Sequence, residues 1–169
     1  VSPSHPSSAD YRVRALSHET GAYIGRTSPQ ITVPGIPGFV DPLQGFVATM
    51  ALDGERLYVG GRFQHVGGVR RAGVAAFNVA SAALEPWEPT VGGPATALAA
   101  DGTRVAVGGG FKSAGGARRS GLAAVDLRTG RLAAVQPPEL PGVNALARSG
   151  DLVVAAAGSE VVGYSASRG

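Results

Sequence analysis

Two pairs of adjacent arginines are the side chains in this sequence best suited to hold a ligand. Arg70-Arg71 and Arg118-Arg119 occupy the same place in two similar segments, 48 residues apart. Guanidinium groups bind carboxylate, phosphate and sulfate through paired, charge-assisted hydrogen bonds. If recurring positions share one face of the fold, we expect a positively charged rim for an anionic ligand, formed by Arg62, Arg70, Arg71, Lys112, Arg118 and Arg119. The alternative is a solvated loop in which the aliphatic arginine stems cover apolar surface.

Other candidate motifs lack the residues that their chemistry needs. Gly108–Ser113 has the look of a phosphate-binding loop, but Phe111 stands directly before Lys112-Ser113, where that motif requires glycine. His5, His18 and His65 show no metal-ligand spacing, and the absence of cysteine excludes disulfides and thiol catalysis. The sequence has no calcium-loop pattern and no nucleophile elbow. We therefore expect no cofactor, no metal and no catalytic residue in this chain, and whether it belongs to an enzyme stays open.

Composition favours a protein of many short strands. The chain has 169 residues, 44% of them hydrophobic, with 26 glycines and 12 prolines, and its apolar runs alternate with turn signals. The formal charge is only +3, and every basic residue except Lys112 is arginine. Because the basic residues are not interleaved with aromatics, we expect no nucleic-acid partner. No apolar stretch approaches the roughly 18 residues of a membrane span.

The chain contains an internal repeat. Residues 47–94 align without gaps on residues 95–142, with matching glycine pairs, arginine pairs and one matching phenylalanine. A third copy begins at Val143 but lacks the loop that carries those residues, so 143–169 is a truncated unit. A partial copy precedes the first unit and gives 11–46 as strands joined by a proline-rich connection, while 1–10 is expected to be a flexible leader.

Each complete unit is expected to contain four antiparallel strands. In the first unit these are 47–52, 56–61, 73–78 and 83–87, with a tight turn at Asp53-Gly54 and a glycine-rich loop over 63–71. Four strands in a unit of about 40–50 residues are typical of a β-propeller blade. The sequence therefore predicts an all-β fold of about three blades, too few to close a ring alone.

The motif of the repeat is similar to that of a known family. Val59-Gly60-Gly61-x-Phe63 and its copy at 107–111, each followed by a second glycine pair and an arginine pair, resemble a bacterial β-propeller repeat family of unassigned function. The resemblance covers 11–169 and departs from the family at Ser81-Ala82, at Gln136-Pro137 and in the shortened third unit. It implies the propeller fold and a secreted or cell-surface location, but no activity.

A second resemblance covers only the start of the chain. Residues 11–15 followed by 28–33 resemble the last two strands of a fibronectin type III domain. The alignment of Thr20-Gly21 on Thr129-Gly130 favours the propeller interpretation. The two interpretations exclude each other for these residues.

An incomplete ring requires further blades. We expect them from self-association or from another chain of the same precursor, because a terminal blade without a neighbour exposes an apolar face. The expected function is a non-catalytic repeat module of an exported protein, acting as a scaffold or binding surface. The alternative is one chain of a processed multi-chain enzyme, a hydrolase or polysaccharide lyase with its catalytic groups on a partner, which would suit a chain that starts at Val1.

Overall fold

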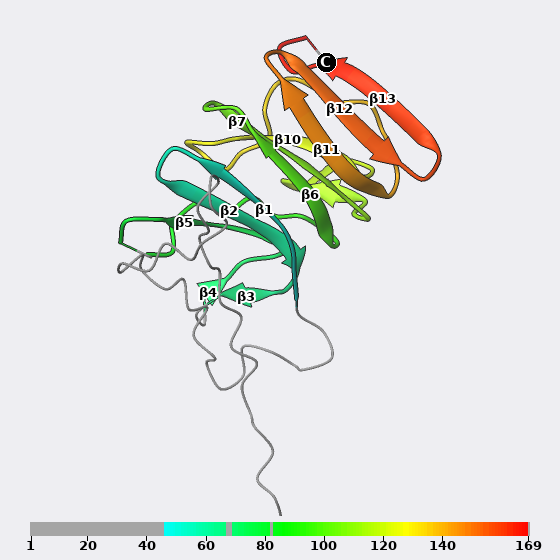
Figure 1. Cartoon of the computed structure of the whole chain (residues 1–169). Helices are drawn as coiled ribbons and strands as arrows, with labels where there is room; N and C mark the ends of the chain where they lie inside the picture. Colours follow the sequence, from blue (N-terminus) through cyan, green and yellow to red (C-terminus); the bar gives the residue numbers. More distant parts are fainter. Residues whose placement is uncertain (1–45, 67–68, 82, 169) are drawn as a thin grey trace, which may run out of the picture.

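The computed structural model describes residues 46–66, 69–81 and 83–168, and this part of the chain is all-β, as predicted. Its strands form three three-stranded antiparallel sheets and two small two-stranded hairpins, and none of these sheets closes on itself (Figure 1). Residues 1–45 lie outside the described part, so the expected leader, the partial unit and the fibronectin-like start are not tested by it. Among the described residues, no helix has the length and apolar character that crossing a membrane would require.

The first sheet has the strand order β1-β2-β5. Its strands and the hairpin that follows β2 are β1 (Phe46–Asp53), β2 (Arg56–Arg62), β3 (His65–Val66), β4 (Val69–Arg70) and β5 (Val74–Asn78). Gly54, with φ of +56°, makes the turn that joins β1 to β2, a conformation that favours glycine. The first three strands predicted for this unit are therefore confirmed, and the predicted glycine-rich loop contains the short β3–β4 hairpin.

The second and third sheets repeat this topology. The second is built from β6 (Ala95–Ala100), β7 (Arg104–Gly109) and β10 (Leu122–Asp126), with a hairpin of β8 (Ser113–Ala114) and β9 (Ala117–Arg118). The third is built from β11 (Val143–Ser149), β12 (Leu152–Ala157) and β13 (Glu160–Ser165). Because the loop that carries the small hairpin is missing from the third sheet, Gly158-Ser159 connects β12 directly to β13.

The fourth strand of each complete unit is reduced to a single residue pair. Leu84 bridges to Phe77 in the first sheet, and Leu132 bridges to Val125 in the second. Pro86 follows this short pairing and has no N–H with which to continue a ladder. The sheets are thus three-stranded with a one-residue fourth row, where the sequence predicts four full strands.

A bulge at the start of the first strand explains the second glycine of each pair. The pairing register shifts between Val47 and Thr49, and again between Ala95 and Ala97. A Cβ on Gly61 would overlap the carbonyl oxygen of Phe46, the residue that begins β1. In the next sheet the carbonyl oxygen of Pro94, the residue before β6, crowds Gly109 in the same way. Only glycine fits where a backbone comes so close.

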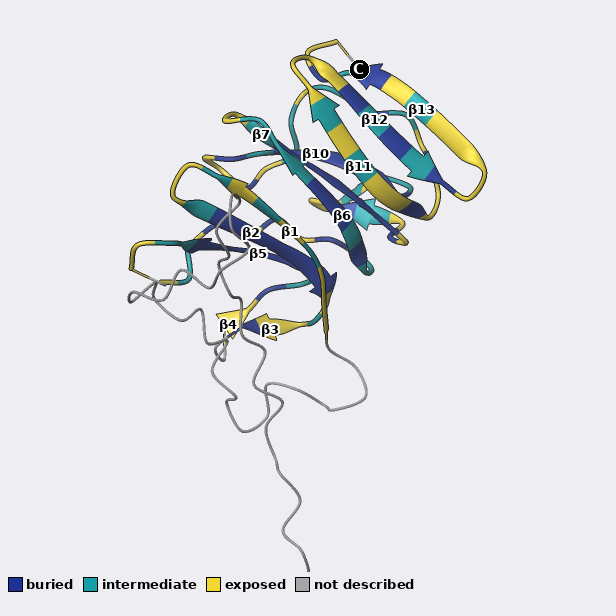
Figure 2. Ribbon diagram, viewed as in Figure 1, coloured by how far each residue is buried: buried dark blue, intermediate teal, exposed yellow. Residues whose placement is uncertain are grey.

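Two of the three buried clusters lie between neighbouring sheets, and the third is formed within the first unit. The cluster between the first and second sheets includes Tyr58, Trp87, Val107 and Phe111, and the ring of Trp87 meets that of Tyr58 edge-on with a centroid distance of 5.1 Å. The indole Nε1 of Trp87 donates a hydrogen bond of 3.1 Å to the carbonyl of Asp126 in the second sheet. Trp87 and Phe111 therefore join adjacent sheets. Figure 2 shows β2, β5, β7 and β10 as the most deeply buried strands.

The first strands of the three sheets lie side by side. β6 contacts β1 of the preceding sheet and β11 of the following one (Figure 1). The outer strands β5, β10 and β13 lie farther from this line and belong to separate sheets. The three sheets thus form a stack that shares one inner edge, and equivalent loops lie at the same end of each sheet.

Candidate functional site

The predicted cationic residues lie on or beside the two small hairpins: Arg70 and Arg118 are on them, and the other four flank them in sequence. In the first, Gly61 donates its backbone N–H to the carbonyl of Gly73, and Gly73 donates to Phe63. The same two bonds recur 48 residues later, from Gly109 to Gly121 and from Gly121 to Phe111. Each hairpin therefore folds back on the end of the strand before it, β2 or β7, and projects from the same end of its sheet.

Arg71 is buried and bound to the backbone. Only 6% of this residue is exposed, its Nη1 donates to the carbonyl of Arg70 at 2.7 Å, and its Nη2 donates to the carbonyl of Glu85 at 3.0 Å. Its Nη1 also lies 3.6 Å from the Glu88 carboxylate. These contacts fix the loop against the short fourth row of the first sheet. Arg71 therefore stabilises the loop and is not an exposed cation on the predicted rim.

The other predicted cations are accessible. Arg62 ends β2, Arg70 lies on β4, and both are exposed. Lys112 is exposed before β8, and the Arg118 side chain on β9 is 87% exposed, with a distant 4.0 Å contact to Glu139. Arg119 is half-buried, and its Nη1 bonds the carbonyl of its neighbour Arg118 at 2.8 Å, which repeats the local bond of Arg71. Four of the six predicted residues, Arg62, Arg70, Lys112 and Arg118, thus have exposed side chains at this end of the sheets.

A concave site lies beside Arg62. It has a volume of about 490 Å³, and its lining residues are Arg62, Phe63, Gln64, Gly73, Val91, Gly93 and Pro94. This volume is in the range of small-molecule pockets. Arg62 supplies a permanent positive charge and Gln64 a side-chain amide, which together suit a carboxylate or sulfate group. The other five predicted cations do not line this pocket.

The sequence alone does not identify the pocket walls opposite Arg62. Val91, Gly93 and Pro94 lie on the connection between the first two sheets, about 30 residues after Arg62. They reach the site because the backbone at Gly93 packs directly on Phe111, where a Cβ would lie 2.8 Å from the Phe111 Cα. No motif marks that connection, so its part in the pocket emerges only from the fold.

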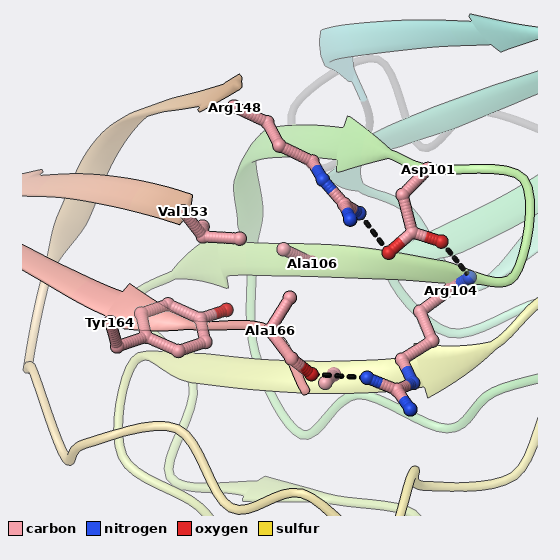
Figure 3. A pocket seen from close by; sticks show the side chains of 8 residues that line it. Asp101, Arg104, Ala106, Arg148, Val153, Tyr164 and Ala166 are labelled. Carbon is pink, nitrogen blue, oxygen red and sulfur yellow. Dashed lines mark hydrogen bonds and ion pairs between the residues drawn. The ribbon is translucent and has the colours of Figure 1, made fainter. Parts of the chain in front are cut away.

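A second, much smaller gap lies between the second and third sheets (Figure 3). Its volume of about 10 Å³ is close to that of one water molecule. Arg148 forms an ion pair with Asp101 across the gap, and Arg104 donates to the carbonyl of Ala166 (Figure 3). Burial raises the pKa of Tyr164 to about 12, so its phenol stays neutral even where an exposed tyrosine would ionise. Asp101 and Arg148 neutralise each other, and Arg104 is bound to a backbone carbonyl. The gap is therefore a contact between the two sheets, with no room for a ligand.

The carboxylates of Asp101 and Asp126 each accept hydrogen bonds within a turn, and Asp101 also forms the ion pair with Arg148. Asp101 accepts hydrogen bonds from the backbone N–H groups of Thr103 and Arg104, at 2.7 and 2.6 Å. The Thr129 hydroxyl bonds Asp126 and lowers the pKa of that carboxyl below its usual value. Across the described ranges, no group of three or more His, Cys, Asp or Glu side chains is arranged to hold a metal ion.

Comparison of the whole chain with protein-family models and with curated proteins gives no match.

Proposed function

We propose that this chain is a run of β-propeller blades that serves an exported protein as a non-catalytic scaffold and binding surface. The three sheets would be the blades, with the inner edge formed by β1, β6 and β11 facing the propeller axis. In this proposal the units 47–94, 95–142 and 143–169 are successive blades of one repeat family. Residues 11–46 would belong to the blade that precedes them.

One observation carries the proposal: the contact between neighbouring sheets is the same at both internal interfaces. Arg56 in the first sheet donates Nη1 to the carbonyl of Leu127 in the second, at 3.2 Å. Arg104, 48 residues later, donates Nη1 to the carbonyl of Ala166 in the third. Each acceptor directly follows the last residue that pairs with the second strand of its own sheet, which is Asp126 before Leu127 and Ser165 before Ala166. A repeated sheet-to-sheet contact of this kind is what blades related by one rotation require.

The binding surface would be the end of the sheets where the small hairpins project. Arg62, Arg70, Lys112 and Arg118 are exposed there, and the 490 Å³ pocket beside Arg62 offers a concave seat. Clustered cations of this type attract carboxylated or sulfated polymers, and free guanidinium groups can bind them with two hydrogen bonds each. An anionic polysaccharide is therefore the ligand class that we propose for this surface.

Replacing three exposed arginines of this surface by glutamine should weaken binding to dextran sulfate about tenfold or more. The variant combines Arg62→Gln, Arg70→Gln and Arg118→Gln, all of which leave the buried Arg71 untouched. Because all three residues are exposed, the melting temperature should stay within about 2 °C of the unchanged protein. The measurement is the dissociation constant at low salt, with thermal unfolding read in parallel.

The matched control also removes three positive charges, but at the end of the sheets opposite the hairpins. Arg128→Gln, Arg131→Gln and Arg168→Gln are exposed changes after β10 and β13, away from the hairpins. Dextran sulfate affinity should change little in this control. An equal loss of dextran sulfate affinity in both variants would mean that net charge alone causes the binding. If the unchanged protein does not bind dextran sulfate, an anionic polysaccharide is not its ligand.

A further inference from the structure

The two small hairpins belong to one continuous strip of paired backbone. β3 pairs with β4 in the first hairpin, and β8 pairs with β9 in the second. The connection between the first two units lies between the hairpins, because Val91 donates its N–H to the carbonyl of Ala72, just after β4, and bridges to Ala114 of β8. We define the strip by its five rows, which are 63–66, 69–73, 90–92, 113–114 and 117–118.

The middle row of the strip is bonded on both sides. Towards β8, Gly92 donates its N–H to the carbonyl of Ser113 at 2.9 Å, and Gly115 donates to the carbonyl of Thr90 at 2.8 Å. On the other side, the row keeps the longer bond of 3.4 Å to the residue after β4. Since neighbouring strands lie about 4.8 Å apart, three steps between rows separate β4 from β9 by roughly 14 Å. The pairing thus sets the spacing of the two hairpins.

The strip turns an apolar face towards the core and its arginines towards solvent. Val91 and Ala114, which bridge to each other, are both buried. Because side chains alternate along a strand, the next residue pair of the second hairpin, which includes Arg118, faces the opposite way. In the first hairpin the exposed Arg70 precedes the buried Arg71, which repeats this alternation. Arg70 and Arg118 therefore both project away from the core.

The exposure of these cations belongs to the interior of the stack. The second unit has a described sheet on each side, and its Lys112 and Arg118 are nevertheless exposed. Arg70 pairs with His65 as Arg118 pairs with Ser113, so it has the equivalent position in the first hairpin. The charged surface thus persists where a sheet has both of its neighbours.

The strip stops at the third unit. A row at 139–141 follows β9, where Leu140 donates its N–H to the carbonyl of Ser120 as the middle row does to the residue after β4. The next residue is Pro141, in the place from which Gly92 donates to β8, and proline has no N–H to give. The third unit also lacks the hairpin that would form the next row.

Negative charge marks the same end of the strip. The carboxylate of Glu139 is exposed and lies 4.0 Å from Nε of Arg118. Glu160, also exposed, begins β13 at the place where the hairpin is missing. An anionic chain that follows the cations from the first hairpin to the second therefore meets like charge at the third unit.

We propose that a single anionic polysaccharide chain lies along the strip and binds Arg70 and Arg118 at the same time. The inference rests on the proposed function, because it takes the ligand class named there and adds its length and its place. The cavity of about 490 Å³ beside Arg62 is lined by the first three rows, which contribute Gly73 and Val91 among others. Two hairpins held roughly 14 Å apart favour a polymer, because binding at one raises the effective concentration of the ligand at the other.

Two probes of different length measure how many hairpins one ligand contacts. A sulfated disaccharide reaches one hairpin, whereas a sulfated oligosaccharide of about eight sugars spans both. Titration calorimetry on the full chain at low salt should give one long oligosaccharide per chain, with a dissociation constant about tenfold or more below that of the disaccharide. Two long oligosaccharides per chain, each bound no more tightly than the disaccharide, would overturn the proposal.

Single substitutions show whether the two arginines share one ligand. Arg70→Gln and Arg118→Gln should each raise the dissociation constant of the long oligosaccharide about fivefold or more, and that of the disaccharide by no more than about twofold. Arg128→Gln is the matched control, because this exposed arginine follows β10 at the opposite end of the sheets. A variant that binds half as many long oligosaccharides with unchanged affinity would mean two separate sites.

Removing the negative charge at the end of the strip tests where the ligand lies. Glu139→Gln should lower the dissociation constant of the long oligosaccharide about two- to threefold, because it removes a repulsion and frees Arg118. Glu55→Gln, exposed in the turn between β1 and β2 at the opposite end, should leave it unchanged. An equal gain in both variants would overturn the placement along the strip.

The failure of this inference can be told apart from the failure of the proposed function. If neither probe binds, the anionic polysaccharide itself is rejected as the ligand class. If both probes bind, but the long one binds twice per chain and with no gain in affinity, the ligand class stands and only the single spanning chain is rejected.

Discussion

Replacing Gly109 by alanine is expected to lower the free energy of unfolding by about 3 kcal/mol or more. A Cβ at this position would overlap the carbonyl oxygen of Pro94, where the chain enters the bulge of β6. The colliding atom belongs to the backbone, so no side-chain rotation relieves the overlap, and β6 must shift. Urea unfolding followed by the fluorescence of Trp87, the one tryptophan of the chain, measures the loss.

Gly110 provides the control one residue away. Its φ is not in the left-handed region, and a Cβ there would meet only the Pro94 side chain at 3.5 Å, an ordinary contact. Gly110→Ala is therefore expected to change the free energy of unfolding by no more than about 0.5 kcal/mol. Gly61→Ala should behave like Gly109→Ala, because the Phe46 carbonyl crowds it in the same way. Equal stabilities for Gly109→Ala and Gly110→Ala would contradict this account of the glycine pairs.

Removing the Asp101 carboxylate should be the most damaging change among the polar residues, with a loss of about 3 kcal/mol. The Asp101 side chain is only 5% exposed, and it pairs with Arg148 of the third sheet, which is 20% exposed. It also accepts the hydroxyl of Thr103 at 2.6 Å, together with two backbone N–H groups of its turn. Asp101→Ala leaves a largely buried guanidinium and these donors without their acceptor.

A double-mutant cycle separates the ion pair from the turn. Asp101→Asn keeps an oxygen for Thr103 and Arg104 but removes the charge, and Arg148→Met removes the cation while keeping an apolar stem. The two changes should be strongly non-additive, because each breaks the same contact between sheets. Asp126→Asn is the reference, since its carboxylate caps a similar turn through Thr129 and forms no ion pair with another of the described residues. Additive effects would mean that Asp101 acts only within its own turn.

The regular strands could be predicted from the sequence because their signals are local. Glycine-containing turns at Gly54 and Gly102 separate apolar runs, and the structure places β1, β2, β6 and β7 on either side of them. The recurring glycine pairs are compatible with a close backbone approach. The identity of the approaching groups, the Phe46 and Pro94 carbonyls, depends on bulges that the residue pattern does not reveal.

The site could be predicted less well, because its geometry depends on distant contacts. Arg70 and Arg71 look equivalent in the sequence, yet Arg71 is buried against the carbonyl of Glu85, 14 residues farther along the chain. The ion pair between Asp101 and Arg148 could not be predicted from the sequence either. The corresponding residues one unit earlier are Asp53 and Ala100, which cannot form an ion pair, so the repeat gave no indication of it.

The fourth strand marks another limit of the repeat. The aligned leucines 84 and 132 predict a strand in both units, and each does pair with the strand before it. Pairing stops after one bridge in both units. In the first unit Pro86 withholds an N–H donor two residues after Leu84, but the second unit has Ala134 at that position, so proline does not explain the stop there. The aligned leucines identified the position of the fourth strand but not the number of residues that pair in it.

The central claim is that both internal interfaces are built by the same contact between neighbouring sheets. Nuclear Overhauser effects test it most directly, from the Leu98 methyl to the Gly60 α-protons and from the Leu146 methyl to the Gly108 α-protons. The account predicts both signals with similar intensity, because in each contact a leucine Cδ1 lies 3.3 Å from the position that a Cβ would take on the glycine. A spectrum that shows the effects expected within each sheet but lacks one or both of these signals would contradict the claim that the two interfaces are alike.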